Sequence, residues 1–396
     1  MLIFPHKWPQ KQNTLIFAST THIWSDLFFA LFVPLLVLIK TDLNLSFTQI
    51  GLLKSMYGGS SAILQMPSGL LAEKVGEFWL LIGGNLWVAI GLIIMSLTQN
   101  YLTLLITTVI GGLGGGTQHP LATSMVSRFY NDQSRSTSVG TVNFAGDLGK
   151  LAAPAITLLI SSQNGWRTTL RLVGIAGVAF MVLLTFTKKT IEATGLVQSN
   201  SHSDSSSDTE WITGFFTLSL IGFLDSSTRG AALTFVPFTL GHKGMTHPQI
   251  FGMLILLLAG GAFGKFVCGW LNSRYDTVSL IWATKSLTAL MLAILTVSPS
   301  IITVPLMVIL GIGLNGTSSV LYAATAELVP HNRRARFYGF LYTTNEIGTT
   351  LAPLLYGILA DILKLRTTML IMALITTLII PISLRLKPYV SPSLKS

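Results

Sequence analysis

The amino-acid sequence predicts an all-α polytopic membrane protein with twelve transmembrane helices in two pseudo-symmetric six-helix bundles. Of the 396 residues, 50% are hydrophobic and only 10% are charged, whereas a soluble globular chain carries roughly 25% charged residues. A membrane span needs about 20 apolar residues, so twelve spans fit this length. The composition excludes a secreted protein, a cytosolic enzyme and a nucleic-acid-binding domain, despite the net charge of +10.

Apolar windows occur in two sets of six. The first set covers 15–39, 48–71, 78–98, 101–126, 136–161 and 167–187. The second set covers 211–240, 247–271, 277–298, 301–326, 336–360 and 366–386. Between the sets, the polar run SNSHSDSSSDTE cannot bury apolar surface and is typical of a flexible linker. We therefore expect an N-terminal bundle at 1–187, a cytoplasmic linker at 188–210 and a C-terminal bundle at 211–396.

Lysine and arginine residues predict the orientation of these helices. With both termini cytoplasmic, fourteen of them, from Lys7 to Lys395, lie in inner segments, and five lie in outer segments. Cytoplasmic loops of membrane proteins carry such an excess. The first window is too long for a signal peptide and contains His22 and Asp26, so it is expected to remain as a membrane helix. The sequence thus predicts a multi-pass protein of a bacterial inner membrane, expected to be a monomer.

An internal repeat supports the division into two halves. Asp26 recurs as Asp225, and Gly116-Thr recurs as Gly316-Thr. Four further positions recur in the same order (Gly140, Asp147, Gly149 and Pro154 as Gly339, Glu346, Gly348 and Pro353). Every offset is 199 or 200 residues. Parallel six-helix halves of this kind are typical of secondary transporters.

The loop after the second window carries a gate-like motif. It reads Gly69-Leu-Leu-Ala-Glu73-Lys74-Val-Gly-Glu77, and this resembles the signature of the major facilitator superfamily, with Glu77 where a base is usual. The small Gly69 permits close helix approach. Because Glu73 and Lys74 can form ion pairs, we expect these three residues to act as a cytoplasmic latch between the halves.

Two further segments resemble the fosmidomycin-resistance branch of that superfamily. They are His22-Ile-Trp-Ser-Asp26 and Gly116-Thr-Gln-His119-Pro120. The resemblance implies the major facilitator fold and efflux driven by proton entry. Asp147 stands where that branch has Asn, and Lys150 stands where it has a small residue.

Several charged residues lie inside the predicted spans, where each costs at least about 2.5 kcal/mol. Three pairs have helical spacing: His22 with Asp26, Asp147 with Lys150, and Asp225 with Arg229. These pairs are either structural or functional. Three remaining bases are expected to extend toward the membrane surface, namely Lys54, Arg171 and Lys285.

Asp26 is predicted to be the principal proton-coupling carboxylate. A histidine beside a carboxylate can relay protons near neutral pH, so His22 is expected to tune it. Asp147 is the next candidate. Helices 1, 4, 7 and 10 line the central cavity in the resembled family, where substrate binds between the bundles at mid-membrane. This resemblance and the guanidinium of Arg229 predict an anionic or zwitterionic substrate, bound by the following residues: His119, Asp225, Arg229, Lys265 and Asn315.

The predicted function is proton-coupled efflux of a small organic compound by alternating access. A proton-coupled importer of an organic anion, sugar or siderophore-like nutrient is the alternative. A membrane receptor or scaffold without turnover is an alternative of another class. No nucleophile–base constellation, phosphate loop or cysteine cluster occurs, and Cys268 is the single cysteine. We therefore expect no catalytic residue, no cofactor and no metal, and expect protons, lipid and a small molecule as partners.

Overall fold

The computed structural model describes residues 10–130, 132–191, 210–330 and 333–390, and these ranges contain helices and no strand. The predicted linker at 188–210 is described only at 188–191 and at 210, and its remainder lies outside the described residues. The same holds for Lys7 and Lys395, which entered the prediction of orientation.

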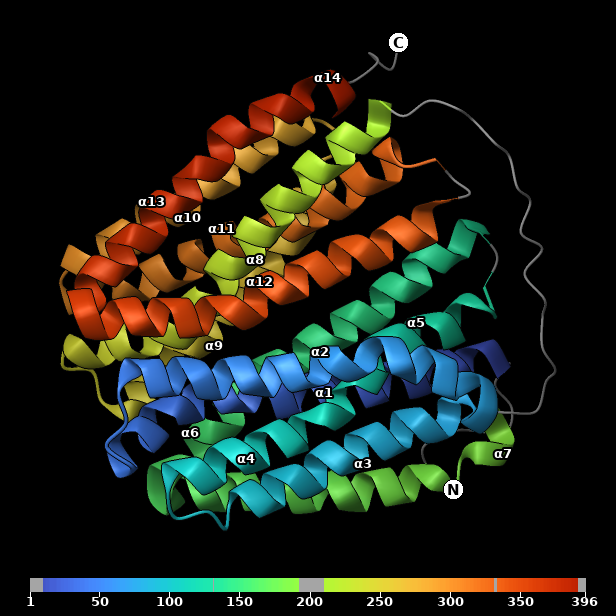
Figure 1. The fold of residues 1–396 in the computed structure, drawn as a ribbon, viewed down its shortest axis with the longest axis horizontal. Coiled ribbons are helices and arrows are strands. Elements are labelled where there is room, and N and C mark those ends of the chain that lie inside the picture. The colour runs from blue at the N-terminus through green and yellow to red at the C-terminus, as the bar shows by residue number, and fades with distance from the viewer. Residues whose placement is uncertain (1–9, 131, 192–209, 331–332, 391–396) are drawn as a thin grey trace. The chain divides into compact units, whose positions relative to one another are not determined.

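The first half of the chain contains the helices labelled α1 to α7 in Figure 1. Their bounds are α1 Gln10–Asp42, α2 Phe47–Val75, α3 Glu77–Met95, α4 Tyr101–Gly112, η1 Leu113–Thr117, α5 Gln118–Ser127, α6 Asp132–Thr185 and α7 Lys188–Ile191. The range of α6 covers two helices that meet at Gly165, whose φ of 74° is not helical. A positive φ is favourable for glycine, which has no Cβ.

The second half contains the remaining helices. Their bounds are α8 Glu210–His242, α9 His247–Leu271, α10 Thr277–Val297, η2 Ser300–Ile302, α11 Thr303–Leu328, α12 Arg334–Leu363, α13 Leu365–Ser383, η4 Leu384–Leu386 and α14 Lys387–Val390. With the broken α4–η1–α5 counted as one span and α6 as two, the described residues form twelve membrane helices. The predicted fold class is therefore confirmed.

Nine of the spans in the described chain are long and apolar enough to cross a membrane on length and composition alone. The spans that begin at 47, 101 and 210 are not among the nine. In α8, Asp225, Arg229 and several Ser and Thr residues lower the mean hydropathy. Asp225 is tolerated because it is buried within the protein and paired with Arg229 and Lys285 rather than exposed to lipid.

Contacts divide the chain into two compact units. Unit 1 consists of Met1–Leu45 and Met56–Ser199, and unit 2 consists of Ser46–Ser55 and Asn200–Ser396. The first turns of α2 therefore group with unit 2. There, the Asp361 carboxylate of α12 accepts hydrogen bonds from the backbone amides of Phe47 (2.9 Å) and Thr48 (2.7 Å), which caps the start of α2.

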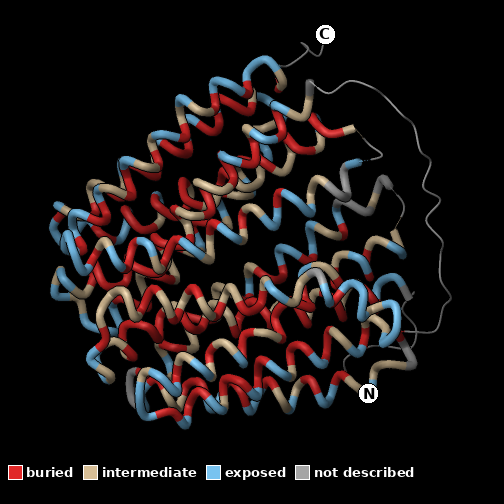
Figure 2. The backbone as a smooth tube through the Cα atoms, viewed as in Figure 1, coloured by how far each residue is buried: buried red, intermediate tan, exposed pale blue. Residues whose placement is uncertain are grey.

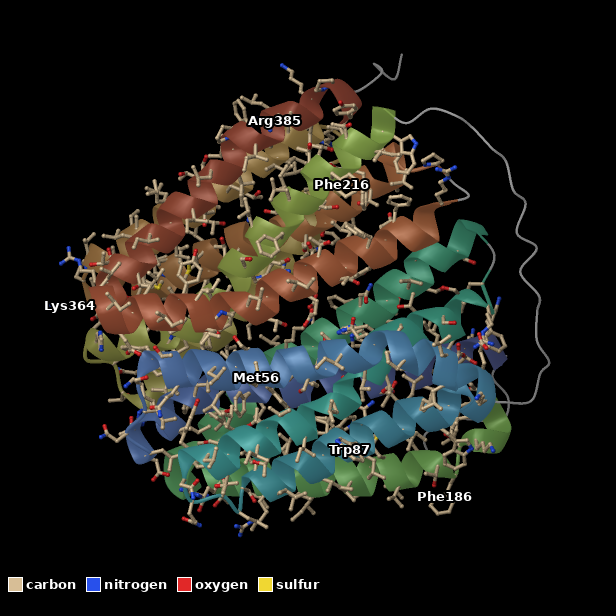
Figure 3. The ribbon with its side chains drawn as sticks, viewed as in Figure 1. Met56, Trp87, Phe186, Phe216, Lys364 and Arg385 are labelled. Atoms are coloured by element: carbon tan, nitrogen blue, oxygen red, sulfur yellow. The ribbon has the colours of Figure 1, made fainter. Side chains whose placement is uncertain are left out.

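Each unit has an apolar core and an apolar outer surface. In unit 1 the core includes Phe17, Phe78 and Met125, and in unit 2 it includes Phe215 and Ile281. Figure 2 shows exposed residues recurring along the same helices that carry these buried ones. Many exposed side chains are large and apolar, such as the labelled Trp87, Phe186 and Phe216 in Figure 3. Such a surface is suited to lipid rather than to water.

The fourth span, made of α4, η1 and α5, is interrupted just before His119, one of the predicted binding residues. Pro120 has no amide hydrogen, so the carbonyl of Gly116 cannot receive its usual helical hydrogen bond. The Ser68 hydroxyl donates to that carbonyl instead, at 3.2 Å. The segment Leu113–Thr117 forms a 3₁₀ helix at this point. This break places His119 in the first turn of α5.

Candidate functional site

The predicted proton-coupling residues form one ion-pair cluster in unit 1. His22 Nε2 lies 3.4 Å from Asp26 Oδ2. The Lys150 ammonium lies 3.0 Å from the same Asp26 oxygen and 3.2 Å from Asp147 Oδ1, so it bridges the two carboxylates. His22 and Asp26 are buried, with 2% and 6% of their surface exposed. The contact between Lys150 and Asp26 joins two pairs that the sequence treated separately.

Two glycines allow α6 to approach α1 at this cluster. A Cβ atom at Gly146 would overlap Asp26 Oδ2 and would lie 2.8 Å from the His22 ring. A Cβ atom at Gly149 would overlap the Ile23 carbonyl oxygen. Gly146 is therefore a positioning residue that the sequence analysis did not identify. The signal available in the sequence was the spacing of these glycines around Asp147.

His119 completes the cluster from α5. The centroids of its ring and the His22 ring are 4.9 Å apart in an edge-to-face arrangement. Each of three residues offers one atom that could coordinate a metal, and these three atoms lie within 4.8 Å of one another: they belong to His22, Asp26 and His119. The side chain of His119 is exposed, whereas those of His22 and Asp26 are buried. The cluster thus combines two imidazoles, two carboxylates and one ammonium.

A second ion-pair cluster lies in unit 2 at the repeat-related position. Asp225 Oδ2 lies 3.5 Å from Arg229 Nη1, as the spacing along α8 predicted. The Lys285 ammonium of α10 forms an ion pair with Asp225 Oδ1. The prediction that Lys285 extends toward the membrane surface is wrong, because its side chain is fully buried. No local pattern on α10 reveals this contact, since its partner is 60 residues away along the chain.

Arg229 lies beside polar and aromatic groups of unit 2. It donates a hydrogen bond to the Ser226 hydroxyl at 2.9 Å, and 20% of its side chain is exposed. Tyr322 of α11 interacts electrostatically with Arg229 and Glu346. Its ring stacks on Tyr342 of α12, with centroids 5.0 Å apart. Asp225 is therefore paired with two bases, Lys285 at one carboxylate oxygen and Arg229 at the other.

Two other predicted binding residues lie at helix contacts. Asn315 is half-buried on α11, where its amide lies against Gly261 of α9 and its Nδ2 donates to the Gly311 carbonyl at 3.5 Å. Lys265 is half-buried on α9, and its backbone carbonyl accepts a hydrogen bond from Ser319 at 3.1 Å. Both contacts also serve the packing of α9 against α11.

The predicted latch residues are on the surface of unit 1. Gly69, Glu73 and Lys74 are all exposed near the end of α2. A Cβ atom at Gly69 would meet nothing within 4 Å among the described residues. Glu77, at the usual position of a base, forms an ion pair with Arg128.

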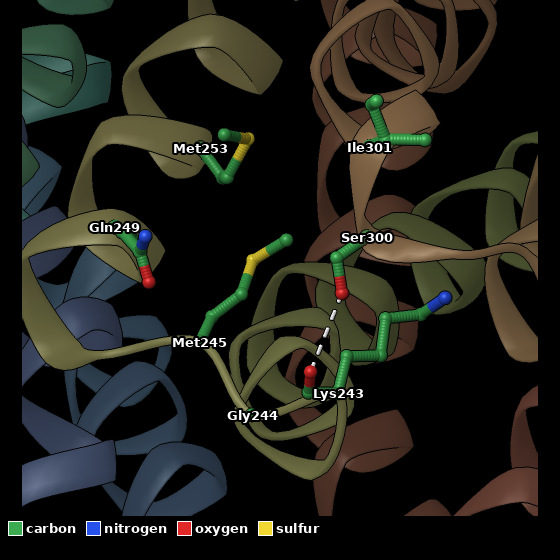
Figure 4. A pocket seen from close by; sticks show the side chains of 7 residues that line it. All are labelled: Lys243, Gly244, Met245, Gln249, Met253, Ser300 and Ile301. Atoms are coloured by element: carbon green, nitrogen blue, oxygen red, sulfur yellow. Dashed lines mark hydrogen bonds between the residues drawn. The ribbon is translucent and has the colours of Figure 1, made fainter.

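A pocket of about 330 Å³ lies elsewhere in unit 2. Figure 4 shows its lining residues, which come from the α8–α9 connection, the start of α9 and η2. The Ser300 hydroxyl donates to the Lys243 carbonyl at 3.3 Å across this pocket. Met245, Met253 and Ile301 contribute apolar side chains to its lining. None of the predicted binding residues lines it.

A family model of the Major Facilitator Superfamily matches residues 19–212 and 218–396. The chain therefore belongs to this superfamily and is a multi-pass membrane transporter. A solved structure described as a bacterial homolog to the human lysosomal transporter Spinster, inward-facing and occupied, has the same fold. Its TM-score is 0.82 at 16% identity, over 97% of this chain and 98% of the other.

Curated relatives are distant. The gentisate transporter of Corynebacterium glutamicum is 25% identical over 80% of this chain and 74% of its own length. The probable L-galactonate transporter of Escherichia coli is 24% identical over 44% of this chain, and the match spans only 40% of that relative. The fosmidomycin resistance protein of Escherichia coli is 24% identical over 42% of this chain and 40% of its own length. The superfamily is thus confirmed, and the predicted branch is represented by one distant relative among several.

Proposed function

We propose that the protein is a proton-coupled carrier of small organic anions in a bacterial inner membrane. The observation that carries this proposal is the unequal distribution of embedded charge. In unit 1 the cluster has two carboxylates, one ammonium and two histidines (Asp26, Asp147, Lys150, His22 and His119). In unit 2 the embedded groups are two acids and four bases (Asp225, Glu346, Lys54, Arg229, Lys265 and Lys285). Lys54, which the sequence analysis expected to extend toward the membrane surface, is half-buried. The remaining base within the spans of unit 1, Arg171, has an exposed side chain and is not a member of the unit 1 cluster.

This distribution of charge supports proton binding by the unit 1 cluster and anion binding by unit 2. With neutral histidines, the cluster of unit 1 has an excess negative charge that one proton can neutralise. Unit 2 has an excess positive charge that an anion can neutralise. Arg229 suits a carboxylate, phosphonate or sulfonate because a guanidinium forms two parallel hydrogen bonds with such groups. The printed names of the relatives also favour anions, since L-galactonate and gentisate are carboxylates.

The negative charge of the substrate affects whether symport or antiport with a proton is favourable. Moving a monoanion inward against an inside-negative potential costs about 2.3 kcal/mol per 100 mV. One proton moving with the anion cancels that cost, so symport makes uptake electrically neutral. Proton-driven efflux, which the sequence resemblance predicts, would instead move the proton against the direction of the anion. We favour symport because opposite charges bind cooperatively, and antiport is the competing mechanism.

A transport assay tests this proposal directly. Purified protein is reconstituted into liposomes that enclose a pH-sensitive dye, and matched organic anions, cations and neutral compounds are added outside. Symport predicts that anions alone acidify the interior. Alkalinisation on addition of anions would establish antiport. Transport of lipophilic cations without transport of anions would refute the proposal.

Two substitutions distinguish the proposed role of the unit 2 cluster in binding the anion from that of the unit 1 cluster in moving the proton. Arg229→Lys keeps the charge but removes the bidentate geometry, and a charged hydrogen bond contributes about 1.5–3 kcal/mol. We therefore expect KM for the anion to rise about 10-fold or more. Asp26→Asn should leave anion binding measurable but abolish the proton movement. An unchanged pH dependence in Asp26→Asn would transfer the proton-coupling role to Asp147.

We propose that Gly69, Glu73 and Lys74 form a latch that pairs in one conformation of the transport cycle. The exposure of these residues supports this role, because a latch must be released in at least one state. Glu73→Ala should change the transport rate more than KM. Equal loss of expression and transport would mean that the motif only stabilises the fold.

A further inference from the structure

The cluster in unit 1 brings together the donor atoms of a transition-metal site. His22 and Asp26 come from one face of α1, and His119 comes from the first turn of α5. One donor atom from each lies within 4.8 Å of the other two. Two imidazole nitrogens and one carboxylate oxygen are ligands that suit zinc, cobalt and nickel ions. The sequence analysis sought metal sites among cysteines and predicted none.

The buried imidazole of His22 is incompletely satisfied. Its Nδ1 atom has no hydrogen-bond partner among the described residues, although only 2% of the residue is exposed. A buried polar atom without a partner costs about 1–3 kcal/mol. Because no partner at Nδ1 fixes the tautomer of the ring, Nε2, which faces Asp26, can coordinate an ion while Nδ1 carries the proton.

The geometry of the cluster requires only a small adjustment to hold an ion. Zinc lies about 2.0–2.2 Å from nitrogen and oxygen ligands, which places neighbouring donors of a tetrahedral site about 3.4 Å apart. The distance from His22 Nε2 to Asp26 Oδ2 is 3.4 Å. A donor separation of up to 4.8 Å must shorten by about 1.4 Å to reach this spacing. His119 is the exposed member of the three and therefore has room to move.

Lys150 occupies the place of a bound cation at Asp26. Its ammonium lies 3.0 Å from Asp26 Oδ2, so a metal ion would have to displace it. The displaced ammonium has an alternative partner, because Asp147 Oδ1 lies 3.2 Å away. The Lys150 side chain is 42% exposed and is not locked in place by packing. Metal binding is thus opposed by Lys150, and also by protonation of the histidines, which must be neutral to coordinate.

We propose that His22, Asp26 and His119 bind a divalent transition-metal ion of the zinc, cobalt and nickel class, in competition with the Lys150 ammonium. This inference does not depend on the proposed transport of anions. It concerns the resting protein without organic substrate, so that binding of the metal and transport of anions can fail independently.

The test uses Co²⁺ alone as the probe, with the full chain in detergent and without a polyhistidine tag. Binding is measured by calorimetry and by the visible absorption of Co²⁺, whose intensity reports coordination geometry. The proposal predicts one Co²⁺ per chain with the spectrum of a nitrogen- and oxygen-ligated site. His119→Gln should weaken binding at least about 10-fold, since even outer-shell changes cost 10–100-fold in affinity.

The decisive variant is Lys150→Met, which removes the competing charge and retains the length of the side chain. It should tighten Co²⁺ binding, whereas a merely structural effect on the cluster would weaken it. His247→Gln, on α9 of unit 2, is the matched control and should leave binding unchanged. Equal Co²⁺ binding by the wild type and by His119→Gln would overturn the proposal, as would weaker binding by Lys150→Met.

Discussion

Removal of the Lys285 ammonium should destabilise the protein, because Asp225 would remain buried with an incomplete set of partners. Only 1% of Asp225 is exposed, and Lys285 is not exposed at all. Breaking a buried ion pair from one side costs about 3–5 kcal/mol. Arg229 lies 3.5 Å from the other carboxylate oxygen and retains part of the compensation. We therefore expect Lys285→Met to cost about 3 kcal/mol.

Thermal unfolding in detergent measures this effect. For a unit of about 200 residues, 1 kcal/mol shifts Tm by about 2–4 °C, so Lys285→Met should lower Tm by about 6–12 °C. The double variant Lys285→Met/Asp225→Asn removes both charges and should recover most of that loss. Arg171→Met is the control, because the Arg171 side chain is exposed and its loss should change stability by less than about 0.5 kcal/mol.

Two results would contradict this account of the unit 2 cluster. One is a Tm of Lys285→Met within a degree or two of that of Arg171→Met, which would mean that Lys285 is not paired in the protein. The other is strict additivity in the double variant, which would mean that the two charges do not interact.

Three further predictions concern packing, capping and orientation. Gly146→Ala should destabilise the protein by about 1–3 kcal/mol, since its methyl group would overlap Asp26. Gly140→Ala on the same helix would meet no described residue within 4 Å and should be neutral or stabilising, and thermal unfolding distinguishes the two variants. Asp276 caps α10 by accepting a hydrogen bond from the Ser279 amide at 2.9 Å, so its replacement by alanine should cost about 1 kcal/mol at neutral pH. Burial opposes ionisation of Asp276, but hydrogen bonds from Ser279 outweigh it and hold the pKa of Asp276 below its usual value. The contribution of a lowered pKa is complete above the unfolded value, so the difference between wild type and this variant should begin to decrease as pH falls below about 4 and should disappear only below the lowered pKa of the folded state. A reporter fused at Ser205 should be cytoplasmic, and a periplasmic signal would overturn the predicted orientation.

The fold was predictable because a bilayer imposes a simple rule on sequence. A chain that crosses lipid must satisfy its backbone hydrogen bonds within helices, so runs of apolar residues reveal the spans directly. The apolar windows located the spans even where Pro120 interrupts the fourth span, α4–η1–α5, and where Gly165 divides α6. The windows at 136–161 and 167–187 separate the two helices of α6 that the structure joins at Gly165.

The candidate site was only partly predictable from the sequence. The pairs His22–Asp26 and Asp225–Arg229 follow from helical spacing, because residues four apart share a helix face, and the structure contains both. Helical spacing contains no information about neighbours on other helices. The bridge from Lys150 to Asp26 depends on how α6 packs on α1, and Gly146 permits that approach only through the absence of a side chain.

Lys285 shows the difference between what the sequence determines and what the tertiary structure decides. Its position in an apolar window is equally compatible with a side chain that reaches the membrane surface and with one buried against an acid. The sequence by itself determined the membrane class, the spans and the pairs within single helices, because these depend on residues near each other along the chain. It also determined the repeat, because a repeat is found by comparing one half of the sequence with the other. Only the tertiary structure decided that Lys285 neutralises Asp225 and that His119 joins His22 and Asp26. The physical reason is that an ion pair or a ligand set depends on distances of a few ångströms between helices, and side-chain packing sets those distances.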